Sequence, residues 1–142
     1  MTALRLLAAP AAALALALGL APAATAAPAA VPPAAVPLAT VHVTDAAGGT
    51  TVHASVGDTV QVDLAALRDH TVTWHWYAPA AATAAVLAQT AAGADPNGDS
   101  HATFTASSAG TSDITAVGRC VPDPRTVCPP FVARWKVTVV VS

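Results

Sequence analysis

Apolar and polar residues alternate with a period of two along most of the chain after Leu38. The alternating runs cover residues 41–44, 51–55, 60–64, 72–77, 102–106, 114–116 and 131–141. Alternation of this kind marks strands that are buried on one face. Turn residues such as Gly57-Asp58 separate the runs at intervals of about ten residues, which is typical of a β-sandwich. The pattern therefore predicts a single all-β domain over residues 38–142, an antiparallel β-sandwich of about seven strands.

Two segments add detail to this prediction. The last run is the longest, and we expect one of its faces to carry Phe131, Ala133, Trp135, Val137, Val139 and Val141. Residues 78–92 are rich in Ala. A strand over 85–89 and a short helix remain equally open there.

The first 37 residues follow another pattern. A short segment with Arg5 precedes an apolar run of Ala and Leu over 6–20, and Ala24-Thr25-Ala26 then offers a small-x-small cleavage site. This order is typical of a secretory signal peptide, and the apolar run is shorter than the ~20 residues of a membrane-spanning helix. Residues 27–37 contain four prolines, which favour an extended leader. We expect a signal peptide over 1–26, a Pro/Ala-rich leader over 27–37, and a secreted, extracellular product. The skew toward Ala, Val, Thr and Pro is typical of a GC-rich genome, such as that of an actinomycete.

Charge excludes several classes of partner. Without Arg5, five of the six Lys and Arg residues remain against eight acidic residues, all Asp, which gives a formal charge of −3. A nucleic-acid binder needs a basic face, and so does a protein that adsorbs to anionic lipid. We therefore expect neither a nucleic acid nor a membrane as partner.

The two cysteines, Cys120 and Cys128, are predicted to form a disulfide, because an exported chain with an even cysteine count most simply pairs them. A zinc site is disfavoured, since it needs four ligands and there is no second cysteine pair. The bond would close the segment 119–130, which holds four prolines and is therefore stiff. Such a loop binds a partner at a low ordering cost, although it also serves to close a long hairpin.

No catalytic or metal-binding motif accompanies these features. The five histidines lack the spacing of an HExxH site. A blue-copper site usually has a methionine ligand, and the only methionine is Met1, which belongs to the predicted signal peptide. GxSxG is absent. Asp95 and Asp99 flank Pro96-Asn97-Gly98, which indicates a β-turn, and the DxDxDG register of a calcium loop is missing. We expect a protein that is not an enzyme, with no cofactor and no metal site.

The sequence from Val43 to Leu64, VTDAAGGTTVHASVGDTVQVDL, resembles the opening of chagasin-like cysteine protease inhibitors. The order that follows is similar too: a Trp-bearing strand, a Gly-containing loop, a Phe-bearing strand, Gly110-Thr111-Ser112-Asp113-Ile114, and a long loop before a closing strand. The resemblance covers most of residues 38–142. It implies an immunoglobulin-like sandwich with three loops at one end that enter the cleft of papain-like proteases.

The resemblance is to the scaffold, because the inhibitory motifs of the family are not matched. Residues 66–70 occupy the place of its Asn-Pro-Thr-Thr-Gly loop, 95–99 retain only Gly98 of a Gly-rich loop, and Arg119 alone matches the start of the third loop. The candidate binding residues on the three corresponding segments are Arg68, Asp69, His70, Asp95, Asn97, Gly98, Arg119, Pro122, Asp123 and Arg125.

Three readings of function follow. The first is a monomeric, non-enzymatic binding module that acts through these loops on a secreted papain-like protease or another extracellular protein. The second is a structural or envelope-associated secreted protein without a specific ligand. The third is a secreted metal-binding protein.

Overall fold

The computed structural model describes residues 35–142. The predicted signal peptide over 1–26 and most of the predicted leader over 27–37 lie outside the described residues. The remainder of the leader, 35–37, has no regular secondary structure. No helix within residues 35–142 is long and apolar enough to cross a membrane.

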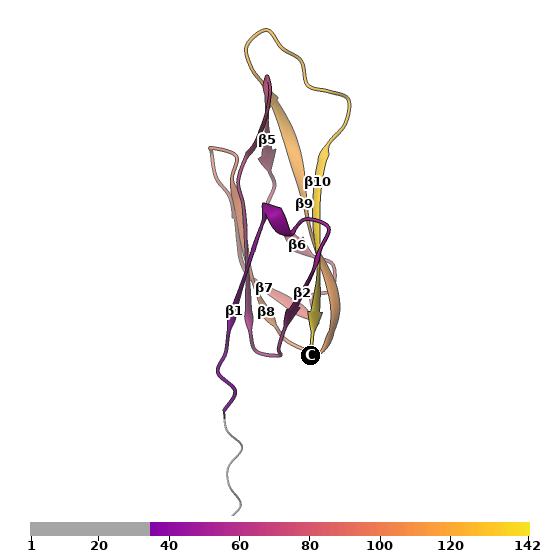
Figure 1. Ribbon diagram of the computed structural model, residues 1–142. Coiled ribbons are helices and arrows are strands. Elements are labelled where there is room, and N and C mark those ends of the chain that lie inside the picture. Colours follow the sequence, from indigo (N-terminus) through magenta and orange to yellow (C-terminus); the bar gives the residue numbers. More distant parts are fainter. Residues whose placement is uncertain (1–34) are drawn as a thin grey trace, which may run out of the picture. The chain divides into compact units, whose positions relative to one another are not determined.

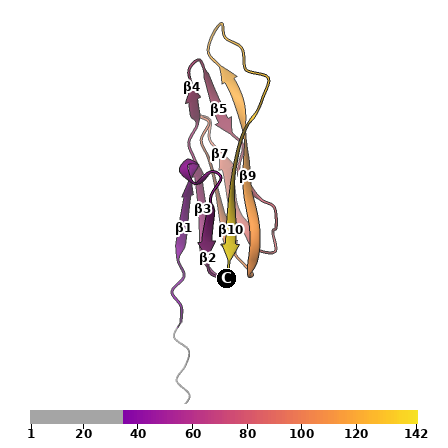
Figure 2. The ribbon, with the colours of Figure 1, turned by 45° about the vertical axis from the view of Figure 1, so that its right-hand side comes forward.

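The described chain forms two β-sheets that face each other, as the alternating pattern predicted (Figures 1 and 2). In sheet A the strand order is β1 (Thr40–Thr44), β3 (Thr59–Leu64), β8 (Ser100–Ala106) and β7 (Leu87–Ala94). In sheet B it is β2 (Thr51–Ala54), β10 (Ala133–Val141), β9 (Gly110–Pro122), β5 (Val72–Trp76) and β4 (Leu67–Asp69), and β6 (Ala80–Ala81) pairs with β9. A single 3₁₀ turn, η1 (Asp45–Ala47), joins β1 to the segment before β2. The predicted all-β sandwich is confirmed.

Two pairings differ from the antiparallel arrangement that the sequence predicted. β1 runs parallel to β3, and β2 runs parallel to β10. The reason is that β1, β2 and β3 alternate in direction while β2 crosses to the other sheet. The two strands that stay in sheet A therefore point the same way. Both sheets are mixed, and every other pairing is antiparallel.

The core lies between the sheets and is built from the apolar positions of the alternating runs. Its largest fully buried side chains include Phe104, Leu64, Leu87 and Ile114. Around them lie the inward-facing valines of β1, β3 and β10, which the period of two placed on one face. The core is thus formed mainly by the strands in which apolar and polar residues alternate most regularly.

The structure resolves or corrects three details of the strands. Residues 87–94 form a strand and not a helix, with a β-bulge between Gln89 and Ala91. β4 and β6 were not expected, because β4 is exposed at all three residues and β6 has only two, so neither shows alternation. Phe131 does not belong to the closing strand, which begins at Ala133, and its side chain is 63% exposed.

Candidate functional site

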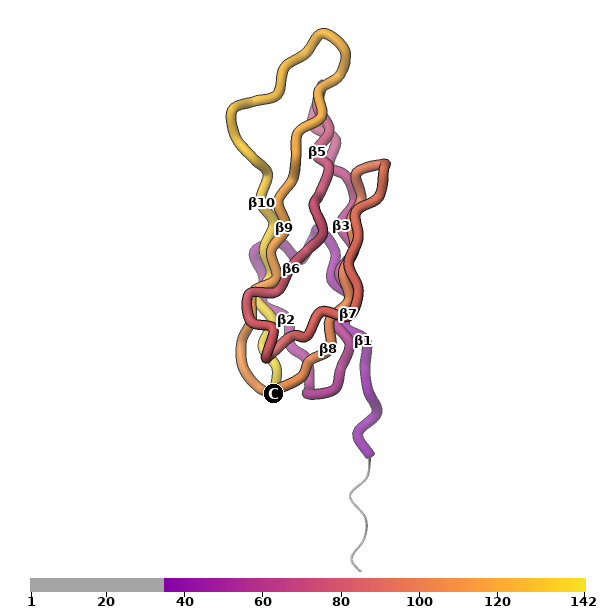
Figure 3. The backbone as a smooth tube through the Cα atoms, turned by 180° about the vertical axis from the view of Figure 1, so that it is seen from behind, coloured from indigo at the N-terminus to yellow at the C-terminus, as the bar shows by residue number. Residues whose placement is uncertain are grey.

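Three segments meet at one end of the sandwich, which we call the loop end: residues 65–71, 95–99 and 123–132. The register explains why. Leu64 lies opposite Ser100, so the end of β3 adjoins the turn between β7 and β8. Val72 lies opposite Pro122, so the start of β5 adjoins the loop after β9. The chain trace shows the three segments extending toward the same end, opposite the C-terminus (Figures 1 and 3).

The segment between β3 and β5 contains three of the predicted binding residues: Arg68, Asp69 and His70. It was expected to be a plain loop, but it forms a short hairpin in which β4 pairs with β5. His70 occupies the turn with a φ of 52°, and its side chain is 94% exposed. Its imidazole Nε2 lies 3.7 Å from a carboxylate oxygen of Asp69. This hairpin presents His70 outward.

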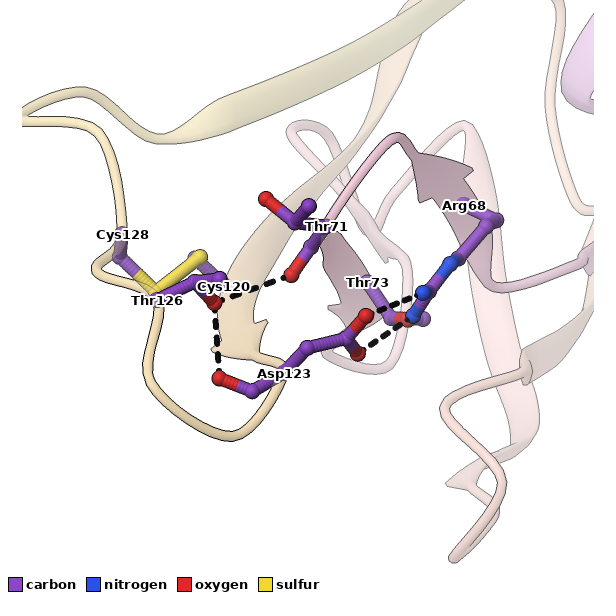
Figure 4. The surroundings of a disulfide bond; sticks show 7 residues. All are labelled: Arg68, Thr71, Thr73, Cys120, Asp123, Thr126 and Cys128. Carbon is purple, nitrogen blue, oxygen red and sulfur yellow. Dashed lines mark hydrogen bonds and ion pairs between the residues drawn. A yellow bond between two sulfur atoms is a disulfide. The ribbon is translucent and has the colours of Figure 1, made fainter.

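Arg68 and Asp123, both among the predicted binding residues, are paired with each other. Arg68 Nη1 donates to Asp123 Oδ1 at 2.7 Å and to Thr73 Oγ1 at 3.0 Å, and its Nη2 contacts Asp123 Oδ2. The hydrogen bond from Arg68 holds the pKa of Asp123 below its ordinary value, and the same bond raises the pKa of Arg68. This bidentate pair ties the hairpin to the loop after β9 (Figure 4).

The segment 120–128, which we call the stapled loop, is closed by the predicted disulfide between Cys120 and Cys128, whose Cα atoms are 5.9 Å apart. Inside it, Thr126 N donates to Asp123 O at 3.1 Å, which closes a turn over Pro124 and Arg125. Thr126 Oγ1 lies 2.7 Å from Asp123 O and 3.2 Å from Thr71 O (Figure 4). Asp123 N also donates to Thr71 O at 2.9 Å. The loop is thus fixed to the body on both sides of its apex.

The β7–β8 turn, residues 95–99, is held by its own groups. Gly98 N donates to Asp95 O at 3.0 Å, Asp95 N donates to Asp99 O at 2.8 Å, and Asn97 Nδ2 donates to Asp99 Oδ2 at 2.7 Å. Asp99 Oδ1 also accepts a bond from Ala66 N at 2.7 Å. Asp99 and Asn97 therefore serve the turn itself, and Gly98 is buried.

Four exposed apolar side chains lie on or beside the segments of the loop end. The stapled loop carries Val127, which is 87% exposed, and the residues before β10 include Phe131 and Val132, which are 63% and 52% exposed. Leu67 on β4 is 51% exposed. We call these four residues the apolar tip. The ring of Phe131 stacks on Trp74, with the ring centroids 5.5 Å apart. The sequence analysis missed the apolar tip because it assigned Phe131 to the buried face of the closing strand and singled out no role for Leu67.

Two hollows lie beside these segments. One, of about 380 Å³, is lined by the carboxylates of Asp45, Asp63, Asp95 and Asp99. The other, of about 450 Å³, lies between Leu67, Trp76, Arg134 and Trp135. Among residues 35–142 no three His, Cys, Asp or Glu side chains come together as metal ligands would. Of the candidate binding residues predicted from the sequence, only Asp95 lines either hollow.

Arg119 and Arg125 remain exposed, and neither makes an ion pair with a described residue. Arg119 lies on β9 opposite His75, at some distance along the sheet from the turn that holds Arg125. Pro122 is the last residue of β9. The structure therefore divides the candidate residues into those that build the loop end and those that it presents to solvent.

Comparison with known proteins gives similar folds only. No family model and no curated protein matches the sequence. The cysteine protease inhibitor EhICP2 from Entamoeba histolytica is a similar solved structure, with 15% identity, 74% of this chain and 97% of that chain covered, and a TM-score of 0.49. Amebosin is 19% identical, with 75% of this chain and 100% of that chain covered and a TM-score of 0.46. The inclusion body protein PixA from Burkholderia cenocepacia is 13% identical, with 72% of this chain and 77% of that chain covered and a TM-score of 0.45. The scaffold resemblance stated from the sequence is confirmed to this extent, and these scores support no statement about function.

Proposed function

We propose that this chain is an exported, non-enzymatic binding module that contacts its partner through the loop end. The observation that carries the proposal is the apolar tip, whose four large side chains are each more than half exposed. Several large exposed apolar residues at one end of a domain favour a contact site there. Export is supported by the signal-peptide pattern and by the disulfide, which persists in oxidising compartments.

The tip is built to bind with little ordering. The disulfide, the Arg68–Asp123 pair and the two bonds to Thr71 O hold the stapled loop in one conformation. A preorganised loop loses less conformational entropy on association than a mobile one. A narrow protrusion of this kind fits a cleft in a partner better than a flat surface.

The partner class that we propose is a papain-like cysteine protease. It is supported by the resemblance of residues 43–64 and of the strand order to chagasin-like inhibitors, and by the meeting of the three corresponding segments at one end. The contact residues would differ from those of that family. Val127 and Phe131 would contact the protease here, in place of the family's inhibitory motifs.

Titration of papain with the purified protein tests this proposal. We expect inhibition at micromolar protein, weakened at least about 30-fold by Val127→Asp, which places a charge at the centre of the contact. Thr111→Asp, at an exposed position on β9 near the opposite end, is the matched control and should change nothing. Absence of inhibition, or equal inhibition by Val127→Asp, would refute the protease assignment.

A further inference from the structure

The stapled loop contains a peptide bond that a second kind of protease could cleave. After cleavage, the two new chain ends would stay attached to the domain. We propose that Arg125 occupies the specificity pocket of a trypsin-like serine protease, with the Arg125–Thr126 peptide bond held at the catalytic serine as a slowly turned-over inhibitor. This inference does not depend on the papain-like assignment, because it uses another residue, another chemistry and another class of enzyme.

Arg125 is singled out by its place in the fold. The described residues include five basic side chains, and four of them lie in strands: Arg68 in β4, Arg119 in β9, and Arg134 and Lys136 in β10. Strand residues paired on a sheet cannot enter a protease cleft without unfolding. Arg125 alone of the five lies outside every strand, exposed, at the apex of the stapled loop. A trypsin-like pocket with a carboxylate at its base selects an arginine or lysine side chain.

Both sides of the Arg125–Thr126 bond are anchored to the body. On the amino side, Asp123 is fixed by Thr71 O through its N–H and by Arg68 through its carboxylate. On the carboxyl side, Thr126 Oγ1 lies 3.2 Å from the same Thr71 O. The disulfide, at a sequence separation of 8, closes a ring of nine residues around the bond. The disulfide and these bonds, which Figure 4 shows, therefore keep both chain ends attached to the domain after cleavage.

This anchoring decides the fate of the acyl-enzyme. The serine oxygen bonds to the carbonyl carbon of Arg125, the bond from that carbon to Thr126 N breaks, and the serine proton passes through the catalytic histidine to the new Thr126 amine. That amine stays beside the acyl carbon, where an intramolecular attack has an effective molarity on the order of 10⁵–10⁸ M. Religation, which reverses each of these steps, then outruns hydrolysis by water.

The turn has to extend for the bond to enter the cleft. Arg125 has a φ of 70°, a left-handed conformation that costs a non-glycine residue roughly 1–2 kcal/mol. Extension breaks the 3.1 Å bond from Thr126 N to Asp123 O and relieves this backbone cost at the same time. Glycine would fit the left-handed conformation at position 125 better than arginine does. The stability of the turn therefore does not explain why this residue is an arginine.

The test is a titration of trypsin and of chymotrypsin with the disulfide-intact protein, with the bound chain analysed by mass spectrometry. We expect stoichiometric inhibition of trypsin, no effect on chymotrypsin, and a steady mixture of intact chain and chain heavier by one water. Arg125→Lys should inhibit within about tenfold of the natural chain, and Arg125→Gly should lose at least about 30-fold while melting no lower.

Arg119→Ala is the matched control, because it removes another exposed arginine, which lies on β9, and it should inhibit as the natural chain does. Absence of inhibition at micromolar protein, rapid complete cleavage without inhibition, or undiminished inhibition by Arg125→Gly would each overturn the proposal. A failure against papain leaves these outcomes unaffected, so the two proposals fail separately.

Discussion

The β7–β8 turn and the stapled loop extend from the same end of the sandwich but are held by different means. In the turn, Asp95, Asn97, Gly98 and Asp99 bond mainly to one another over two to four residues. The stapled loop depends on distant partners: Arg68 reaches Asp123 across 55 residues, and Thr71 reaches Thr126 across the same span. A turn can therefore be encoded by a pentapeptide, whereas the shape of the stapled loop depends on the fold around it.

Gly98→Ala should break the turn, and we expect this to be the largest effect. Gly98 has a φ of 97°, and a Cβ there would lie 2.5 Å from Cδ2 of His75. Left-handed strain and overpacking together predict a loss of about 3 kcal/mol in the free energy of unfolding, measured by chemical denaturation.

The control for this substitution is Gly49→Ala. Gly49 has a φ of 77°, but a Cβ there meets nothing within 4 Å. Only the backbone cost of about 1 kcal/mol should remain. Equal losses for the two variants would show that the contact with His75 contributes nothing.

Removing the disulfide should loosen the stapled loop while leaving the turn intact. Cys120→Ser with Cys128→Ser is expected to cost about 2–3 kcal/mol, because the unfolded chain regains the entropy of an open loop. Thermal melting measures the loss. Amide exchange should accelerate at Asp123 and Thr126 and stay unchanged at Gly98 and Asp99. Faster exchange at the β7–β8 turn would contradict the independence of the two segments.

Phe131→Ala should uncover Trp74 and cost about 1 kcal/mol, the size of one aromatic pair. Tryptophan fluorescence should shift to the red, since Trp74 is buried in the native protein. Val127→Ala is the matched control, because Val127 is 87% exposed. Its tryptophan emission spectrum should equal that of the natural chain.

Acid should release the stapled loop from the hairpin with the smallest effect of the four. Arg68 lowers the pKa of Asp123. The stabilisation from this pair is therefore complete above the ordinary carboxyl pKa and is lost as pH falls through the lowered folded value. Side-chain NMR resonances of Arg68, followed from about pH 6 to about pH 2, should report this loss. Asp123→Asn should abolish the transition, and persistence of the transition would assign it to another group.

The sandwich could be predicted from the sequence where burial imposes alternation, as at Val60, Val62 and Leu64. The disulfide followed from the cysteine count, and the turn at 95–99 from its own residue types. β4 could not be predicted, because it is exposed on both faces and its pairing with β5 alone defines it.

The candidate site was harder to predict than the fold. The pairing of Arg68 with Asp123 could not be predicted, because nothing in their local sequence reveals a bond across 55 residues. Phe131 was assigned to the core because it continues the period of β10, yet the strand begins two residues later. Long-range pairing thus decides which polar and apolar residues of the loop end face solvent.

The place of β10 in sheet B bears on when the domain can fold. β10 follows every other strand in the chain, yet it lies between β2 and β9, and Val141 pairs with Ala54. A growing chain therefore has no position for β2 in its sheet until β10 has been synthesised. Contacts so far apart in sequence form slowly. Until then β2 has no strand of sheet B to pair with, and the sandwich stays incomplete.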